Sequence, residues 1–303
     1  MAKQKQGRHR SFRTQAWLDR VFDIFNYTVL GLIAVCVLYP LYFIVIASFS
    51  DPVAINNGQV LLFPVGFNTT GYQKIFENTK IWRSYSNTIF YTIAGTAINV
   101  ILTMMLAYPL SRKNFFARKF IMFFVMFTMY FQGGLIPTYL WMNDLNLYNT
   151  PWVMILLPAV NVFNLIIAIN YMKTNIPEEL FEAASIDGCS HIGFFAKIIL
   201  PLSKTIVVVL TLYYGVAHWN EFMNGLIYLR DEGFYPLQLT LRNILLQNQA
   251  SGLGDVDSII EQQKAAELIK YGAIIVSTLP VMAVYPFLQK HFAKGLMVGS
   301  VKG

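Results

Sequence analysis

The sequence predicts an all-α membrane protein with six transmembrane helices. The chain of 303 residues is 55% hydrophobic and only 13% charged, and its mean hydropathy is +0.48. Its apolar residues gather in runs long enough to cross a bilayer, which takes roughly 20 residues per helix. Basic residues flank these runs in alternate loops, as the positive-inside rule requires when both termini are cytoplasmic. The net charge of +7 therefore fits a membrane protein better than a nucleic-acid-binding protein.

The expected spans divide the chain into a transmembrane domain and two cytoplasmic ends. Residues 1–20 are basic and poor in apolar side chains, so we expect them to be disordered or to lie on the membrane surface. The transmembrane domain covers residues 21–291, and residues 292–303 form a cytoplasmic tail. A short interfacial helix is expected at 71–76. The six spans are expected at about 24–49, 85–110, 120–142, 152–172, 198–228 and 269–288.

Three of the spans contain residues that weaken a helix. Pro40 is expected to kink the first span, because proline removes a helical hydrogen bond. Gly133, Gly134 and Pro137 weaken the third span near its outer half, and Pro158 interrupts the fourth.

A polar stretch at residues 175–201, called the coupling loop below, separates two long apolar runs. Asn175 can cap a short helix, and Pro177 suits the first turn of that helix. Gly188 is expected to end the helix, because glycine tolerates the backbone turn that other residues resist. Ser190 can then cap a second short helix. The coupling loop is therefore expected to form a helix, a sharp bend and another helix on the cytoplasmic side.

The coupling loop carries a spaced motif: Glu182-Ala183-Ala184, three residues, Gly188, nine residues, Ile198, one residue and Leu200-Pro201. This spacing resembles the EAA motif of the membrane subunits of ABC importers, without a gap or substitution. In that family the loop forms coupling helices that dock into a groove of the ATP-binding subunit. The alternative is an interfacial helix that merely lies on the lipid surface. The acidic residues of the loop disfavour that alternative, since they would face an anionic leaflet.

The resemblance covers nearly the whole chain after residue 20 and implies a type I ABC importer permease fold with cytoplasmic coupling helices. Glu182 would pair with a basic residue of the ATPase across the interface, although a solvated surface carboxylate is the simpler interpretation. The residues expected to couple to the ATPase are Glu178, Glu182, Ala183, Ala184, Asp187, Gly188, Leu200 and Pro201.

Two further segments resemble carbohydrate importers of the maltose type, in particular their Gram-positive oligosaccharide branch. One is the end of the chain, which reads Phe-Ala-Lys-Gly-Leu at 292–296 and Gly-Ser-Val-Lys-Gly at 299–303. The other combines Tyr-Phe-Gln-Gly-Gly-Leu-Ile-Pro-Thr at 130–138 with Tyr-Pro-Leu-Gln-Leu at 235–239. These segments imply an oligosaccharide as the transported solute, but they do not name one sugar.

A polar cluster at residues 218–221 lies in the outer half of the fifth span and suggests a substrate pathway. A carboxylate near a span is costly unless it meets water, a charge or a cavity, and Trp beside Asn and Glu suits sugar recognition. The alternatives are an interfacial Trp and a headgroup-level Glu, and Asn161 could instead join two helices. The candidate pathway residues are Tyr130, Gln132, Asn161, Trp219, Asn220 and Glu221.

The outer loop at residues 229–267 is the most polar part of the chain, and its tip suits contact with an external solute-binding protein. A disordered linker is the alternative. The candidate contact residues are Gln247, Asn248, Gln249, Ser251 and Gly252.

The chain has no phosphate-binding Gly-x-x-x-x-Gly-Lys-Ser/Thr loop, so we expect ATP and Mg to bind to partner chains and this chain not to be an enzyme. The resemblance implies a second homologous permease, two ATP-binding subunits and an extracytoplasmic solute-binding protein in the membrane of a bacterial cell. A peptide or another polar solute is an alternative cargo. A secondary transporter would show broken helices in paired repeats, and a membrane enzyme would need a convergent catalytic set; neither is seen.

Overall fold

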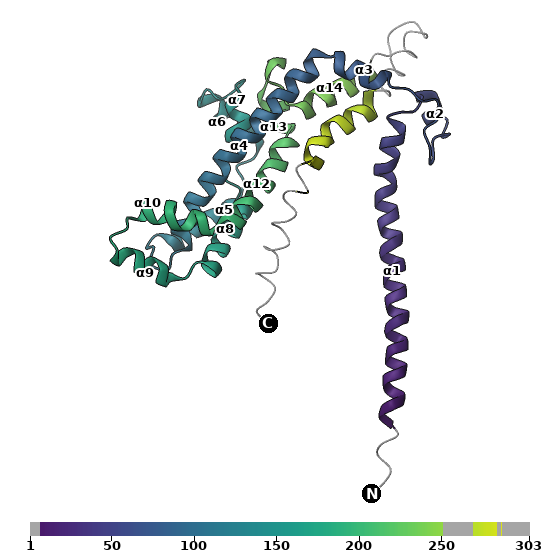
Figure 1. Ribbon diagram of the computed structural model, residues 1–303. Coiled ribbons are helices and arrows are strands. Elements are labelled where there is room, and N and C mark those ends of the chain that lie inside the picture. Colours follow the sequence, from purple (N-terminus) through teal and green to yellow (C-terminus); the bar gives the residue numbers. More distant parts are fainter. Residues whose placement is uncertain (1–6, 251–268, 284–285, 287–303) are drawn as a thin grey trace. The chain divides into compact units, whose positions relative to one another are not determined.

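The structure, a computed structural model, describes residues 7–250, 269–283 and 286, and these form helices joined by short connections (Figure 1). The chain divides into two compact units, which are described separately. The first comprises residues 1–73 and 263–275, and the second comprises residues 74–262 and 276–303. The second unit contains the coupling loop and the candidate pathway residues.

The first unit is dominated by α1 (Gly7–Ala47), whose stretch Asp19–Ala47 is apolar enough to span a membrane. The helix begins at Gly7, so residues 7–20 are helical rather than disordered, and their expected position on the membrane surface stays a prediction. Arg, Gln and Ala are good helix formers, and they let the apolar helix extend toward the N-terminus. Pro40 lies inside α1, and the kink expected at this residue stays a prediction.

The segment after α1 folds back on itself. It contains α2 (Pro52–Asn56) and is closed by backbone hydrogen bonds from Asp51 N to Val65 O at 2.9 Å and from Asn68 N to Phe49 O at 2.9 Å. The next helix, α3 (Thr70–Glu77), confirms the short helix expected at 71–76.

The central element of the second unit is α4 (Thr79–Ser111), whose N-cap Asn78 accepts a hydrogen bond from Lys80 N. This cap starts the helix earlier than the expected position near residue 85. Buried residues recur every three or four positions along α4, which is the spacing of one helix face. That face is unusually polar, because it includes Ser84, Asn99 and Thr103. Four helices pack against α4: α7 (Pro151–Leu156), α8 (Val162–Asn175), α12 (Lys204–Trp219) and α14 (Leu237–Ala250).

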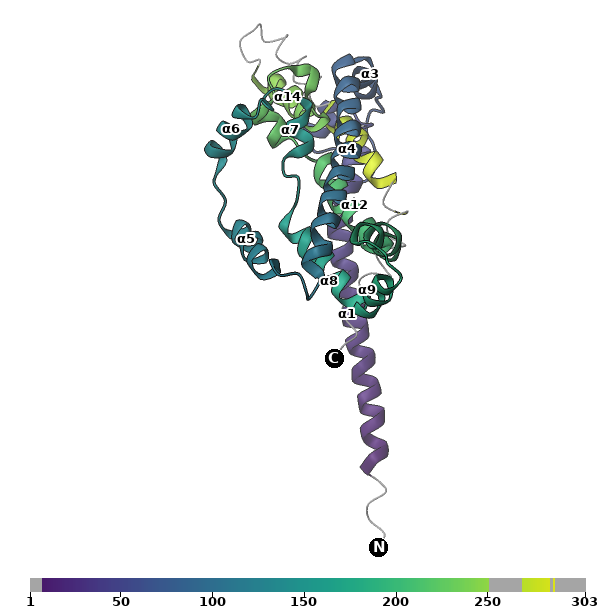
Figure 2. The same cartoon turned by 90° about the vertical axis from the view of Figure 1, so that its left-hand side faces the viewer.

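The third expected span is two helices rather than one continuous helix. Helices α5 (Arg118–Tyr130) and α6 (Leu135–Asp144) meet at 116°, and Figure 2 shows them joined by an extended connection. Gly134 in this connection has a φ of +91°, a left-handed conformation that glycine adopts readily. The glycine pair thus breaks the span instead of only weakening it.

The fourth expected span is also divided, into α7 (Pro151–Leu156) and α8 (Val162–Asn175), with Pro158 between them. Asn161 caps α8, since its side chain accepts a hydrogen bond from Asn164 N at 3.2 Å. The interruption expected at Pro158 is therefore a complete break of the helix.

The prediction of one continuous helix for the fifth span, residues 198–228, is wrong. This span follows α10 (His191–Phe194) and comprises η1 (Phe195–Ile199), α11 (Leu200–Leu202), α12 (Lys204–Trp219) and α13 (Met223–Tyr228). The axis turns by 80° between His191–Leu202 and Lys204–Trp219. The break falls at Ser203, between α11 and α12, where the backbone leaves the helical conformation.

The number of spans in the described residues is smaller than the expected six. Two helices are long and apolar enough to cross a membrane, and four spans result if each bent pair counts as one. The helix Ile269–Ala283 occupies the position of the expected sixth span. The structure therefore establishes an all-helical fold in its described part without confirming six spans.

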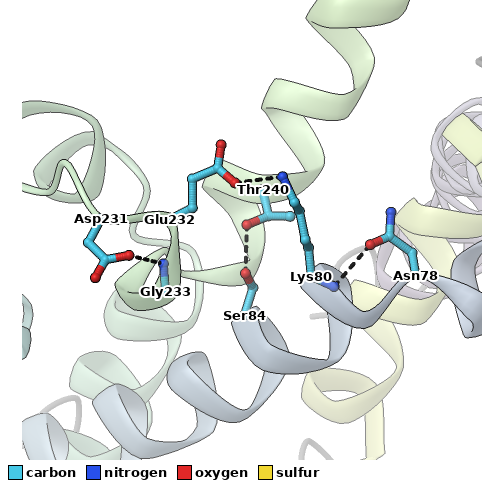
Figure 3. Close-up of polar contacts among 7 residues, drawn as sticks. All are labelled: Asn78, Lys80, Ser84, Asp231, Glu232, Gly233 and Thr240. Atoms are coloured by element: carbon cyan, nitrogen blue, oxygen red, sulfur yellow. Dashed lines mark hydrogen bonds and ion pairs between the residues drawn. The ribbon is translucent and has the colours of Figure 1, made fainter.

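The expected outer loop 229–267 is largely structured in its first half, which corrects the expectation of a long polar loop. It forms η2 (Glu232–Phe234) and α14 (Leu237–Ala250), which lie along α4 (Figure 3). Ser84 Oγ lies 2.6 Å from Thr240 Oγ1, and Leu237 N donates to Thr88 Oγ1 at 2.7 Å. Buried leucines on α14 explain its order, because a polar loop would not supply this packing.

Two substitutions on α4 should show that a buried contact with this outer segment contributes more to stability than an exposed one. Ser84 is 1% exposed, so Ser84→Ala leaves the hydroxyl of Thr240 unpaired at a cost of about 1–3 kcal/mol. Lys80 pairs with Glu232 at 2.6 Å, but the two side chains are 69% and 59% exposed. Lys80→Ala should therefore cost less than about 1 kcal/mol. Thermal unfolding of the two purified variants tests this ranking, and equal melting temperatures would contradict it.

Candidate functional site

The coupling loop forms two short helices around a left-handed bend. Helix α9 (Glu178–Ile186) is followed by Gly188, whose φ is +71°, and Cys189 N donates to Ala184 O at 2.9 Å. Ser190 then caps α10, since its Oγ accepts a hydrogen bond from Gly193 N at 3.2 Å. The expected helix, bend and helix are thus confirmed, with the bend at Gly188.

The expected cap of α9 is wrong. Asn175 is the last residue of α8, and its Nδ2 donates to Tyr171 O at 2.9 Å. The N-cap position of α9 belongs to Pro177, which makes no side-chain hydrogen bond there. The residue before a proline favours extended backbone, so α8 ends at this point and α9 starts afresh after Pro177.

The two faces of the coupling loop differ in burial. Ala184 and Phe194 are buried in the same hydrophobic cluster as residues of α4, α8 and α12. The opposite face exposes 87% of Ile186 and 81% of Ile192. Aliphatic side chains that are this exposed, near the exposed carboxylates Glu182 and Asp187, are typical of an interaction surface. Sequence analysis missed both isoleucines, although Ile186 lies off the buried positions of α9.

The predicted coupling residues divide between these faces. Glu182, Ala183, Asp187, Gly188, Leu200 and Pro201 are exposed, whereas Ala184 is buried. Glu178 faces inward, with Oε1 at 3.6 Å from Nη1 of Arg112. The exposed members, together with Ile186 and Ile192, form a surface that is available to a partner.

A polar pocket of about 250 Å³ lies between α4, the α7–α8 connection and α12. It contains two of the predicted pathway residues, Asn161 and Glu221, and it was not foreseen as a pocket shared with α4. Its lining residues are Asn99, Leu157, Pro158, Asn161, Phe163, Asn164, Tyr213, Tyr214, Ala217, His218 and Glu221.

A hydrogen-bond network from three elements shapes one side of the pocket. The Tyr214 hydroxyl lies 2.7 Å from Thr103 Oγ1 and accepts a hydrogen bond from Asn161 N at 3.0 Å. Asn99 Nδ2 lies 3.1 Å from His218 Nε2 and donates to Pro158 O at 3.3 Å. These bonds hold α4, the start of α8 and α12 together, so a displacement of α4 would alter the pocket.

The pocket offers acceptors for a hydroxyl-rich ligand. Asn99 is 2% exposed, and its Oδ1 has no hydrogen-bond partner among the described residues. The carboxylate of Glu221 accepts one hydrogen bond, from Asn224 N at 2.9 Å through Oε1. Buried polar atoms of a binding site need a partner from the ligand or from water, and a sugar hydroxyl supplies a donor.

The other predicted pathway residues do not line this pocket. Trp219 is buried, donates from Nε1 to Ser277 O at 2.9 Å and lines a separate apolar pocket of about 710 Å³. Asn220 donates to Val216 O in its own helix. Tyr130 ends α5 with 74% of its surface exposed, and Gln132 lies in the break that follows. Sequence analysis missed Asn99 and Tyr214. Each could have been found as a polar residue within an apolar helix.

The predicted contacts with a solute-binding protein are only partly described. Gln247, Asn248 and Gln249 belong to the last turn of α14 rather than to a flexible tip. Ser251 and Gly252 lie outside the described residues, as does the tail 292–303.

Comparison with known proteins identifies the family. Residues 7–298 match the model of the family described as binding-protein-dependent transport system inner membrane component. Protein LplC of Bacillus subtilis (strain 168) is 39% identical over 295 residues, which cover 97% of this chain and 99% of that protein. The polygalacturonan/rhamnogalacturonan transport system permease protein YtcP of the same organism is 40% identical over 287 residues, covering 94% and 99%.

A solved structure supports the same assignment at the level of the fold. It is the crystal structure of a bacterial ABC transporter involved in the import of the acidic polysaccharide alginate. One of its chains is 33% identical to this chain with a TM-score of 0.82, and the match covers 90% of this chain and 97% of that chain. The chain therefore has the ABC permease fold, and a permease is the membrane subunit rather than the ATP-hydrolysing subunit of such a transporter. It belongs to the family of binding-protein-dependent transport system inner membrane components.

Proposed function

We propose that this chain is one membrane subunit of an ATP-driven oligosaccharide importer. It forms half of the translocation pathway and couples to an ATPase through the coupling loop. A second homologous permease supplies the other half, and two ATP-binding subunits with ATP and Mg dock on the cytoplasmic side. A solute-binding protein delivers the oligosaccharide from outside. In this proposal the chain crosses a bacterial cell membrane six times, with the expected six spans broken as described and both termini in the cytoplasm.

The observation that carries the proposal is the polar pocket, whose lining includes the unpaired Asn99 Oδ1 on α4 and the Glu221 carboxylate just after α12. Asn99 Oδ1 and the Glu221 carboxylate suit the hydroxyl donors of a sugar. Two relatives support this cargo class by name, YtcP and the arabinooligosaccharides transport system permease protein AraQ of Halalkalibacterium halodurans, which is 26% identical over 276 residues.

The coupling mechanism follows from the two faces of the loop. The exposed face, with Ile186 and Ile192, would rest in the groove of an ATP-binding subunit. The buried face, with Ala184 and Phe194, packs in one cluster with residues of α4, α8 and α12 and would move with them. Closure of the ATPases on ATP would displace the loop and switch the pocket between inward and outward access, and hydrolysis would reset it.

Stimulation of ATP hydrolysis by loaded binding protein tests this function. The complex is purified with its own ATPase, reconstituted into vesicles, and assayed with its binding protein and a panel of neutral oligosaccharides, uronate oligosaccharides, peptides and polyamines. Oligosaccharides are expected to stimulate hydrolysis, and peptides and polyamines are not. Stimulation by a peptide alone would refute the cargo class, and absence of a co-purifying ATPase would refute the importer.

The exposed isoleucines provide a prediction about docking. Ile186→Asp should reduce co-purification of the ATPase by about tenfold, because a charge would be buried in an apolar contact. The matched control is Phe116→Asp, which places the same charge on a fully exposed apolar residue of a different loop. Quantification of the ATPase in the purified complex decides: equal loss in both variants, or none in either, would contradict the assigned docking face.

Glu221 provides a prediction about the sugar. Its carboxylate should repel uronate groups, and the pocket's lining residues in the described part of the chain include no Lys or Arg to offset this. Glu221→Gln should therefore raise uptake of uronate oligosaccharides relative to neutral ones by about three- to tenfold. Glu232→Gln, on the outer segment, is the control. If the ratio of uronate to neutral oligosaccharide uptake into vesicles is unchanged, Glu221 does not face the transported sugar.

A further inference from the structure

Arg112 lies in a cage where α4 meets the coupling loop. Its Cζ atom is 4.8 Å from the ring centroid of Phe181, 5.1 Å from that of Phe194 and 5.4 Å from that of Tyr108. Phe181 belongs to α9, Phe194 to α10 and Tyr108 to α4 itself. Glu178 on α9 adds a carboxylate at 3.6 Å. One guanidinium thus contacts three separate helices.

The contacts of Arg112 are attractive, but they do not fix a single geometry. Its side chain is only 13% exposed, and its Nε and Nη2 atoms are buried without a hydrogen-bond partner among the described residues. A bidentate pair with Glu178 would fix one geometry at about 2.7–2.9 Å, which is shorter than the observed 3.6 Å. Cation–π attraction to ring faces tolerates small rotations of the rings. The cage can therefore keep α9 and α10 attached to α4 while their relative angle changes.

The position of Arg112 at the C-cap of α4 gives this cage a functional consequence. Thr103 and Asn99, which belong to the network around the polar pocket, lie nine and thirteen residues before it, or about 14 and 20 Å along a helix. On the other side of the cage, the coupling loop exposes Ile186 and Ile192. Arg112 is thus located between the proposed ATPase-docking face and the pocket.

We propose that Arg112 is the positioning residue that transmits movement of the coupling loop to α4, and through α4 to the polar pocket. This proposal rests on the proposed function, which sets the direction in which movement is transmitted: from the ATPase to the translocation pathway. Arg112 contacts the inner face of the coupling loop. Replacing Arg112 therefore leaves the docking face intact and weakens the transmission of movement from the loop to α4. Full transmission needs arginine, because the compact and strongly hydrated ammonium of lysine stacks less well on the three rings.

The test measures how nucleotide changes access to the pocket, which requires no transported sugar. In a Cys36→Ser, Cys189→Ser background, Ala217→Cys places a thiol on the pocket lining. The complete complex in vesicles is labelled from outside with a membrane-impermeant maleimide, with and without a non-hydrolysable ATP analogue. Nucleotide is expected to raise the labelling rate, and Arg112→Met is expected to reduce that increase by about tenfold while the ATPase stays bound.

Three further variants make the result decisive. Phe181→Leu should reduce the nucleotide response as well, and Arg112→Lys should restore it only in part. Lys113→Met, which removes the exposed neighbouring charge, should respond as the parent does. A parental response in assembled Arg112→Met or Phe181→Leu would overturn the proposal. Full rescue by lysine would also overturn it, since charge alone would then suffice.

Two remaining outcomes separate this inference from the proposed function. If neither Arg112→Met nor Phe181→Leu retains the ATPase, the cage supports docking or folding and the proposal fails. If the parent complex responds to nucleotide and the two variants do not, while no oligosaccharide is transported, the proposal holds and only the assigned cargo is wrong.

Discussion

Gly188→Pro is expected to reduce oligosaccharide-stimulated ATP hydrolysis by about tenfold or more. The φ of Gly188 is +71°, whereas proline fixes φ near −65°, so the bend between α9 and α10 cannot form. Proline also removes the N–H that Gly188 donates to Ser185 O at 3.1 Å. Because the bend aligns the two helices of the coupling loop, its loss should misplace the docking face. Stimulated ATPase activity of the reconstituted complex measures the effect.

The control for this prediction is Gly188→Asn. A side chain at this position would meet nothing within 4 Å, so space is not the constraint. Asn tolerates the left-handed conformation better than other residues with a side chain, and stimulation should remain within about threefold of the parent. If Asn and Pro reduce stimulation equally, the backbone conformation of Gly188 is not what coupling requires.

Gly95→Ala is expected to have the second large effect, on both stability and transport. A Cβ at position 95 would lie 2.5 Å from Cε1 of His218, which is an overlap that the packed helices must relieve. The expected cost is about 1–3 kcal/mol, which is typical of overpacking. His218 would be displaced from Asn99, and the pocket that both line would change shape. Thermal unfolding and vesicle uptake measure the two effects.

Gly215→Ala is the matched control for Gly95→Ala. Gly215 lies on α12, and a Cβ there would meet Thr96 Oγ1 at 3.7 Å, an ordinary contact. Alanine also favours the helix over glycine by about 1 kcal/mol, so this variant should be at least as stable as the parent. In addition, Gly95→Ala should cost less in a His218→Ala background, where the overlap is removed, than in the parent. A stable Gly95→Ala protein with unchanged uptake would show that this close approach is not needed.

The coupling loop could be predicted from sequence because its structure is local. Gly188 and Ser190 are residues whose own backbone and side chain determine a bend and a cap, and both act as expected. The cap assigned to Asn175 failed, since α8 continued through that residue and used its side chain for an internal hydrogen bond. Which of two adjacent helices includes a boundary residue depends on packing as well as on propensity.

The broken spans and the pocket could be predicted only in part. Pro158 and the pair Gly133-Gly134 were recognised as weak points, but an angle of 116° depends on what the separated helices pack against. Asn161 and Glu221 were selected as polar residues near spans, and the structure brings both to one pocket. Trp219 was selected by the same reasoning and is instead buried against Ser277. Composition indicates which residues need a polar partner, and only the tertiary arrangement determines which partner they find.

Uptake of labelled oligosaccharides into vesicles that contain the complete complex tests the central claim most directly. The vesicles are supplied with the binding protein on the outside and with ATP and Mg on the inside. We expect at least one oligosaccharide to accumulate with ATP, not with a non-hydrolysable analogue, and not in the Ile186→Asp complex. Accumulation without ATP, or undiminished accumulation in the Ile186→Asp complex, would contradict an importer driven through the coupling loop.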